Sequence, residues 1–444
     1  MMPRVSAVSL IVAAGLSLTA CGSGYFGDIE DDLILPGERI PIVLADDDPK
    51  ADDSLAEKPV ALPPPRLNAD WPQVGGDAGH AVGHLALDDA PQQVWRRRVG
   101  RGSDDHRRLG APPVVAEGRV FTVDTDGQVA ALNMADGRVL WRTATVIGDD
   151  DERTLFAGGL ARVGEMVLLA RGDGRLIALA AADGSRRWSV ATGMPLRGAP
   201  VVDGDRVVVV GLNNTAQAHA IEDGRLLWQH RGFDESATVF GGASAAMSGP
   251  WTVVPYSSGE VFALRRTNGR VVWADNFSAY RGGKGLTSMA TIGGYPVIDR
   301  DMVLVSSHSG RLTALDLTTG TRLWERRLGG FNPPWPAGDY VFVIDRKNRV
   351  LCLRREDGRV RWVTALPLFS DPEERADPIT VHGPVLAGDR LLVADSTGRV
   401  SALSPYDGAI LGSIKVGAPV FLPPVVVDQT VLVLDDDGTL TAYR

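Results

Sequence analysis

The sequence predicts an all-β fold, an eight-bladed β-propeller of four-stranded antiparallel blades whose last blade is closed by both chain ends. The first observation is a phrase that returns along the chain, for example VAALNMADGRVLW at 129–141 and LTALDLTTGTRLW at 312–324. The second is a valine-rich strand before each copy, and the third is a final copy that is split between the two ends. Self-similarity with a period of ~40–50 residues is typical of propeller blades.

The repeated phrase reads as a β-hairpin with a glycine in its turn. The turn glycines are Gly137, Gly184, Gly224, Gly269, Gly320, Gly358 and Gly408. A tryptophan follows four residues later at Trp141, Trp188, Trp228, Trp273, Trp324 and Trp362. The seventh copy has Gly412 instead, so we expect its blade to be the least well packed. With the valine-rich strand and one further short strand, such as APVVD at 199–203, each unit has four strands.

The two chain ends complete each other. TVLVLDDDGTLTAYR at 430–444 runs through the first part of an eighth copy, and PQQVWRRRV at 91–99 contains Trp95 with no hairpin before it. A closed ring can build one blade from both ends, whereas an open array needs capping repeats. We therefore expect the strand at Trp95 to pair with the strand that ends near Arg444.

A column of small residues precedes the leucine of each copy. It consists of Ala131, Ala178, Ala220 (if the third copy is two residues shorter), Ala263, Ala314, Cys352, Ala402 and Ala442. Small side chains there would let neighbouring sheets approach, while tryptophan fills the wider gap between blades. The expected blade-docking residues are Trp95, Trp141, Trp188, Trp228, Trp273, Trp324 and Trp362. By its place in this column, Cys352 reads as a core residue and not as a nucleophile.

The N-terminus resembles a lipoprotein signal. A short positive region at Arg4, an apolar stretch at 5–16 and the small residues of SLTAC at 17–21 read as a secretory signal peptide. Leu18 to Cys21 match the bacterial lipobox, which implies cleavage before Cys21 and lipid attachment to it. A cysteine that stands at the cleavage site of a soluble secreted protein by chance is the alternative. Gly22, rather than aspartate, after the lipidated cysteine favours the outer membrane.

Charge and composition divide the rest of the chain. Residues 28–57 carry eleven acidic and two basic residues, which accounts for the formal net charge of −9. We expect a signal peptide at 1–20, a lipid-anchored, acidic flexible tether at 21–66, and the propeller at 67–444. The short cluster of Arg96, Arg97, Arg98 and Arg101 reads as a solvated rim, and no long basic stripe for nucleic acid is present.

Few residues suggest catalysis. Cys21 and Cys352 are the only cysteines. His80 and His84 are spaced by four residues, but the glycine-rich stretch around them disfavours a helix and makes a metal site weak. Most acidic residues of the repeats stand in Asp-Gly or Gly-Asp turns, which the backbone explains. We expect no catalytic residues, no metal and no cofactor.

The hairpin resembles the repeat of pyrroloquinoline-quinone propellers, A-L-D-x-x-T-G-x-x-x-W, which TALDLTTGTRLW at 313–324 matches at every fixed position. In quinoprotein dehydrogenases this motif docks blades and is not the catalytic site, so the resemblance implies the fold and not the activity. Those enzymes also use a vicinal cysteine pair, which this chain lacks. A quinoprotein-type oxidoreductase or a small-ligand-binding propeller remains the alternative function.

As a whole, the lipobox, the tether and the propeller resemble the BamB family of the outer-membrane β-barrel assembly machinery. The resemblance implies a non-catalytic scaffold at the periplasmic face of the outer membrane, anchored to the membrane by lipid. The implied partners are the periplasmic transport domains of the central barrel subunit and nascent outer-membrane proteins. A propeller of the cell envelope with an unrelated partner has the same fold.

The resemblance also implies a site for the barrel subunit. In the family this surface includes a loop with two apolar residues before an arginine, and MPLRG at 194–198 matches it, with Met194, Leu196 and Arg197. The alternative is a loop between blades whose Leu196 packs inwards. A second family feature, two aspartates before the fifth copy, is absent, because Ser288 and Ala290 stand there. A contact in that region would have to be apolar or use other residues, such as Arg281 or Lys284.

Overall fold

The computed structural model describes residues 48–55, 58–146, 157–196, 198–233, 244–277, 292, 294–308 and 310–444. This part of the chain contains one short 3-10 helix, η1 (Asp53–Leu55), and strands β1 to β34. The strands form eight four-stranded antiparallel sheets and one hairpin of β26 (Phe369–Asp371) and β27 (Ala376–Pro378). The predicted eight-bladed propeller is confirmed. Among the residues described, no helix has the length and apolar character to cross a membrane.

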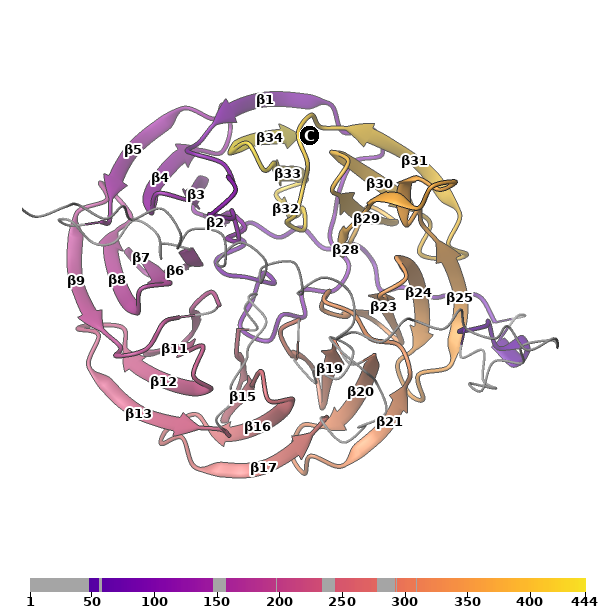
Figure 1. Cartoon of the computed structure of the whole chain (residues 1–444), viewed down its shortest axis with the longest axis horizontal. Coiled ribbons are helices and arrows are strands. Elements are labelled where there is room, and N and C mark those ends of the chain that lie inside the picture. The colour runs from indigo at the N-terminus through magenta and orange to yellow at the C-terminus, as the bar shows by residue number, and fades with distance from the viewer. Residues whose placement is uncertain are drawn as a thin grey trace, which may run out of the picture. The chain divides into compact units, whose positions relative to one another are not determined.

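Each blade is a meander of consecutive strands, and the fourth strands form the outer rim of the ring (Figure 1). Blade 1 consists of β2 (Val114–Ala116), β3 (Arg119–Val123), β4 (Gln128–Asn133) and β5 (Val139–Ala144). Blade 2 consists of β6 (Ala157–Val163), β7 (Met166–Arg171), β8 (Arg175–Ala180) and β9 (Arg186–Ala191). Blade 3 consists of β10 (Val201–Asp203), β11 (Arg206–Val210), β12 (Thr215–Ala220) and β13 (Leu226–Arg231). Blade 4 consists of β14 (Ala246–Ser248), β15 (Trp251–Pro255), β16 (Glu260–Arg265) and β17 (Val271–Asn276).

The remaining blades repeat this order, except that the last is shared by the two chain ends. Blade 5 consists of β18 (Val297–Asp299), β19 (Met302–Ser307), β20 (Arg311–Asp316) and β21 (Arg322–Arg326). Blade 6 consists of β22 (Trp335–Ala337), β23 (Tyr340–Ile344), β24 (Arg349–Arg354) and β25 (Val360–Ala365). Blade 7 consists of β28 (Val381–Ala387), β29 (Arg390–Asp395), β30 (Arg399–Leu403) and β31 (Ile410–Lys415). Blade 8 consists of β32 (Val425–Val427), β33 (Thr430–Leu434), β34 (Thr439–Tyr443) and β1 (Gln93–Arg98).

The ring closes as predicted. β1 pairs antiparallel with β34, and Trp95 lies opposite Ala442. Beyond these strands the Gln92 N–H donates to the Arg444 carbonyl at 2.8 Å, and the Arg444 N–H donates to the Gln92 carbonyl at 2.9 Å. Because all four strands of this blade are hydrogen-bonded, closure leaves no open end that would need a cap.

The small-residue column lies directly opposite the tryptophans, with one correction. Trp228 pairs with Ala218, which stands six residues before Gly224 as in the other copies, and not with Ala220, which was expected for a third copy shortened by two residues. Cys352 pairs with Trp362 and is fully buried, as its place in the column predicted. In blade 7, Ala402 pairs with Gly412. Each blade therefore keeps one register between its third and fourth strands.

The hydrophobic core lies between blades. One cluster joins Phe121 and Val129 of blade 1 to Leu169 and Ile177 of blade 2, and the other clusters also combine residues of neighbouring blades. Because each sheet is stacked between two neighbouring sheets, both faces of its second strand are buried, which explains the continuous valine-rich runs there. The stability of the ring therefore depends on the interfaces between neighbouring sheets, which we call seams.

The segment before β1 packs on the propeller from its first described part onward. The Asp52 N–H donates to the Val360 carbonyl of β25 at 2.8 Å, and Val60 is 5% exposed. Further along, the Asp428 N–H of blade 8 donates to the Asn68 carbonyl at 2.8 Å. The boundary predicted between residues 66 and 67 thus falls inside a segment that contacts the blades. The predicted signal peptide, and the tether as far as residue 47, lie outside the described residues.

Candidate partner-binding surface

The connections of the meander fall on two opposite faces of the ring. Because neighbouring strands run in opposite directions, the turns between second and third strands share a face with the connections from one blade to the next. We call this face the loop face. The turns between third and fourth strands, which contain the repeated glycines, lie on the other face. Since interaction residues concentrate on loops held by a rigid scaffold, the longer and more varied loop face is the candidate site.

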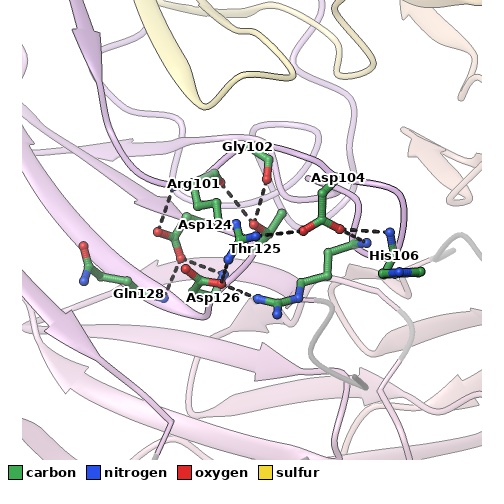
Figure 2. Close-up of polar contacts among 9 residues, drawn as sticks. Arg101, Gly102, Asp104, His106, Asp124, Thr125, Asp126 and Gln128 are labelled. Atoms are coloured by element: carbon green, nitrogen blue, oxygen red, sulfur yellow. Dashed lines mark hydrogen bonds and ion pairs between the residues drawn. The ribbon is translucent and has the colours of Figure 1, made fainter. Parts of the chain in front are cut away.

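The loop from blade 8 to blade 1 shows how these connections are held (Figure 2). The Arg101 N–H donates to Asp124 Oδ2 at 3.1 Å, and Thr125 Oγ1 donates to the Gly102 carbonyl at 2.8 Å. On the other side, the Ser103 N–H donates to the Asp436 carbonyl of blade 8 at 2.8 Å. A Cβ at Gly102 would lie 2.2 Å from that carbonyl oxygen, so the close approach requires glycine. The loop is thereby fixed to the turns of both blades it joins.

Charges on this loop are paired with one another. Arg101 donates to Asp104 at 3.1 Å, and Arg107 forms an ion pair with Asp126. Hydrogen bonds from the backbone N–H groups of His106 and Arg107 lower the pKa of Asp104. Ion pairs at the protein surface contribute little to stability, because water and salt screen them. They shape the loop and leave a surface of mixed sign.

The loop from blade 2 to blade 3 contains the residues predicted for partner binding. Met194 is 4% exposed and Leu196 is fully buried, and both belong to the core cluster between these two blades. Leu196 also forms an isolated β-bridge with Gly211, and Thr192 Oγ1 donates to the Met194 carbonyl at 2.9 Å. The structure therefore has the arrangement in which Leu196 packs inwards. Direct contact of Met194 and Leu196 with a partner would require the loop to leave its place, because both side chains are covered.

Other predicted residues fall outside the part of the chain that the structure describes. These are Cys21, Arg197, Arg281, Lys284, Ser288 and Ala290. Arg197 directly follows the buried Leu196, so the backbone on its N-terminal side is fixed to blade 3. The predicted roles of all six remain predictions.

The tryptophans join one blade to the next. The indole N–H of each donates to a backbone carbonyl of the following blade, at 2.8–3.0 Å. In order from Trp95 to Trp362, the acceptors are Met134, Ala181, Ile221, Arg266, Leu317, Arg355 and Pro405. Each ring also lies against the turn glycine of the following blade. These seven seams hold the loop face in a fixed arrangement.

Two exposed phenylalanines on the loop face were not predicted. Phe233 is 71% exposed, although its N–H donates to Glu260 Oε2 at 2.8 Å and its carbonyl accepts from Asn214 Nδ2 at 2.9 Å. Phe331 is 51% exposed and its ring centroid lies 4.3 Å from that of His308. Solvent-exposed aromatic side chains on a backbone that is fixed by hydrogen bonds are typical of binding surfaces. The signal in the sequence was a Gly-Phe pair after a fourth strand, at 232–233 and 330–331.

The histidines and the cysteine that were considered for metal binding or catalysis do not form a common site in the described part of the chain. His80 Nδ1 lies 2.8 Å from the Pro296 carbonyl and His84 Nδ1 lies 2.9 Å from the Pro63 carbonyl. Burial lowers the pKa of His80 to about 4, and it raises the pKa of the Cys352 thiol. In the described ranges no three metal-ligating side chains come together. The histidines and the cysteine contribute to packing and to backbone hydrogen bonds.

Comparison with known proteins gives one family. The family model described as "Outer membrane protein assembly factor BamB" matches residues 82–148, 145–364 and 371–444. The BamB of Shewanella oneidensis is 29% identical over 358 residues, which covers 79% of this chain and 88% of that protein. The BamB of Escherichia coli (strain K12) is 28% identical over 363 residues, with the same coverage of 79% and 88%.

Solved structures share the fold. The crystal structure of BamB from Moraxella catarrhalis has a TM-score of 0.65 at 20% identity and covers 80% of this chain and 99% of that chain. The quinohemoprotein alcohol dehydrogenase from Comamonas testosteroni has the same TM-score, 0.65, at 15% identity, and covers 84% of this chain and 80% of that chain. An enzyme and an assembly factor resemble this structure equally well, so the fold does not decide between them.

Proposed function

Since this chain belongs to the family of the outer membrane protein assembly factor BamB, we propose that it is a scaffold in the assembly of outer-membrane β-barrel proteins. The family is one of non-catalytic assembly factors. The observation that carries the proposal is the extent of the family match, which begins at residue 82 and reaches residue 444, over all eight blades. The likeness to a quinohemoprotein dehydrogenase concerns the fold alone.

The proposed location is the periplasmic face of the outer membrane. Cys21, at the end of the lipobox, would carry the lipid, and Gly22 favours retention in the outer membrane. Several acyl chains anchor a protein stably, whereas a single chain binds only marginally. The tether would then let the propeller reach its partners from the membrane surface.

The proposed partners are the periplasmic transport domains of the central barrel subunit and the nascent outer-membrane proteins. The barrel subunit would dock on the loop face, where Phe233 and Phe331 are exposed and where Arg197 follows the buried Leu196. In this arrangement Met194 and Leu196 hold the loop from inside and Arg197 makes the contact. Nascent strands would add to the free edges of fourth strands, because an edge strand offers unpaired backbone groups.

Charge reversal on the two faces tests the proposed docking. The change is Arg197→Glu on the loop face, and its matched control is Arg138→Glu, an exposed arginine beside a turn glycine on the opposite face. We expect the full-length lipoprotein to recover the barrel subunit from detergent-solubilised envelopes. Arg197→Glu should lower that recovery at least tenfold, which corresponds to about 1.4 kcal/mol or more.

Three outcomes separate the elements of this proposal. Equal losses in both variants would mean a general effect of charge and not a loop-face interface. Full recovery with Arg197→Glu would keep the function and move the contact to other loop-face residues, with Phe233→Ala and Phe331→Ala as the next variants. Absence of the barrel subunit from the wild-type eluate would contradict the proposed function itself.

A further inference from the structure

The seam between blades 7 and 8 has no tryptophan and contains a cavity of about 610 Å³. Gly412 stands at the tryptophan position of β31, and a Cβ added there would meet nothing within 4 Å. On the blade 8 side, Pro91 stands four residues before Trp95, where the other copies have the turn glycine. Gly412 and Pro91 thus occupy the two repeat positions at which the other seams have a tryptophan packed against a glycine. In this seam both residues line the cavity.

The walls of this cavity are apolar and come from both blades. Blade 7 contributes Leu392, Val400 and Ala402, and blade 8 contributes Val431 and Tyr443. All except Ala402 are less than 9% exposed. A volume of this size falls within the range of about 300–1,000 Å³ that is usual for binding sites. The seven filled seams show that an indole ring suits this position between blades.

β31, the fourth strand of blade 7, lines the cavity and is exposed along its whole length. Every residue of β31 is exposed, and Ile410, Leu411 and Ile414 are 58%, 56% and 40% exposed. Within the described residues β31 pairs only with β30, so its outer edge has backbone groups available for another strand. An exposed apolar edge strand is a ready template for strand addition. The cavity thus lies beside an edge on which an extended segment can be held.

The mouth of the cavity is acidic. Asp89, which is fully exposed, and Asp389, which is 54% exposed at its side chain, line the cavity, and the exposed Asp88 directly precedes Asp89. The cation among them, Arg390, donates to the carbonyls of Asp88 and Asp89 and to the Gly388 carbonyl at 3.1 Å, and it lies 3.7 Å from the Asp89 carboxylate. The Asp389 carboxylate accepts a hydrogen bond from the neutral hydroxyl of Tyr406. Three carboxylates with one arginine leave an excess of negative charge, which favours a cationic partner.

We propose that the seam between blades 7 and 8 binds an extended polypeptide segment that inserts an aromatic side chain, flanked by lysine or arginine, into the place left by the missing tryptophan. The segment adds to the edge of β31, its aromatic ring fills the space between Gly412 and Pro91, and its cationic neighbour faces Asp89 and Asp389. This site lies between blades 7 and 8, whereas the proposed docking loop joins blades 2 and 3. A peptide assay needs no assembly machinery, so the two proposals fail independently.

The test measures binding of a fluorescent peptide by anisotropy. The probe is a short peptide of alternating valine and threonine with a central tryptophan between two lysines, and the protein is the folded chain without its signal peptide. One matched peptide replaces the tryptophan by alanine, and another replaces both lysines by glutamate. We expect the alanine peptide to bind at least about tenfold more weakly, because an aromatic side chain loses its burial.

Two protein variants address the site directly. Gly412→Trp fills the cavity and should abolish binding, whereas Val272→Trp, which adds the same side chain on β17 where Trp273 already fills the seam, should leave it unchanged. Asp89→Lys changes only an exposed charge and so leaves the fold intact. It should weaken the lysine peptide several-fold and strengthen the glutamate peptide.

The proposal is overturned if Gly412→Trp binds the probe as wild type does, or if wild type does not bind it. Self-association by light scattering that Gly412→Trp abolishes, without peptide binding, would also overturn it and assign the groove to a second copy. If Gly412→Trp does not fold, the proposal is tested by comparing how Asp89→Lys and wild type bind the lysine and glutamate peptides. An unchanged preference between the two charged peptides then counts against the proposal.

Discussion

Replacement of Trp228 by alanine removes one of the seven tryptophans that join blades. The side chain on β13 is 7% exposed, and its indole N–H donates to the Arg266 carbonyl of blade 4 at 2.8 Å. A Cβ at Gly269 would lie 2.7 Å from the ring, so the contact between blades is tight. We expect a loss of about 3–5 kcal/mol in the free energy of unfolding, as for other large-to-small core substitutions.

Thermal unfolding followed by circular dichroism measures this loss. With an unfolding entropy of about 2.1 cal/mol/K per residue, the ring gains about 0.8 kcal/mol/K on melting, so Tm should fall by roughly 4–6 °C if the ring unfolds as one unit. Trp228→Phe keeps most of the apolar area but removes the N–H, and should show a smaller drop. Leu226→Ala changes an exposed side chain on the same strand and should lie within about 0.5 kcal/mol of wild type.

An unchanged Tm for Trp228→Ala would contradict a stabilising role of this tryptophan. It would mean that the seam between blades 3 and 4 contributes little, and that each sheet is stable mainly through its own hydrogen bonds. An equal drop for Leu226→Ala would show that the strand, and not the contact between blades, is sensitive.

Three further predictions concern other parts of the chain. Cys21→Ser should move the protein from the membrane to the soluble periplasmic fraction, and continued sedimentation with membranes would contradict lipid anchoring. Leu196→Ala should cost about 2–5 kcal/mol because the side chain is fully buried between blades 2 and 3, and an unchanged Tm would show that the loop moves freely. The pKa of His80 is about 4 in the folded protein and ~6.5 when unfolded, so stability should fall by about 3 kcal/mol as pH drops from ~6.5 to ~4. His80→Asn, which tolerates the φ of 62° at this position, should flatten that decline, and an identical pH profile would contradict the assignment.

The periodicity of the chain predicted the fold because a propeller blade is a local unit. Turn glycine and tryptophan lie four residues apart on one hairpin, and the ring only repeats that hairpin. The split copy at the two ends predicted the pairing of Trp95 with the last strand. The error at Ala220 arose from treating the third copy as two residues shorter than the others. The copy keeps the common spacing, and Ala218, six residues before Gly224, lies opposite Trp228.

The site was harder to predict because exposure depends on the neighbouring blade. Met194 and Leu196 stand in a loop between blades, but their side chains are buried in the seam that the loop crosses. Phe233 looks no different in sequence. It is exposed because the hydrogen bonds that it donates to Glu260 and accepts from Asn214 hold only its backbone. The residue types in these loops can be read from the sequence, but contacts with the neighbouring blade determine which side chains face solvent.

The cavity at Gly412 could be predicted from the sequence only in part. Its place in the repeat predicted a poorly packed blade, and the cavity is found there. The acidic mouth, however, is formed by Asp89 and Asp389, which are 300 residues apart in the sequence. They come to the same groove because the segment before β1 packs directly on blade 7, where Leu85 bridges to Ala387 and Arg390 donates to the Asp89 carbonyl.

The most direct test of the central claim, that the loop face docks the barrel subunit, is site-specific photo-crosslinking in living cells. A photoreactive amino acid would replace Phe233 on the loop face, or Asp223 on the opposite face of the same blade 3. We expect a crosslink to the barrel subunit from position 233 and none from position 223. A crosslink from position 223 alone would place the interface on the opposite face, and the absence of that partner from both would contradict the proposed function.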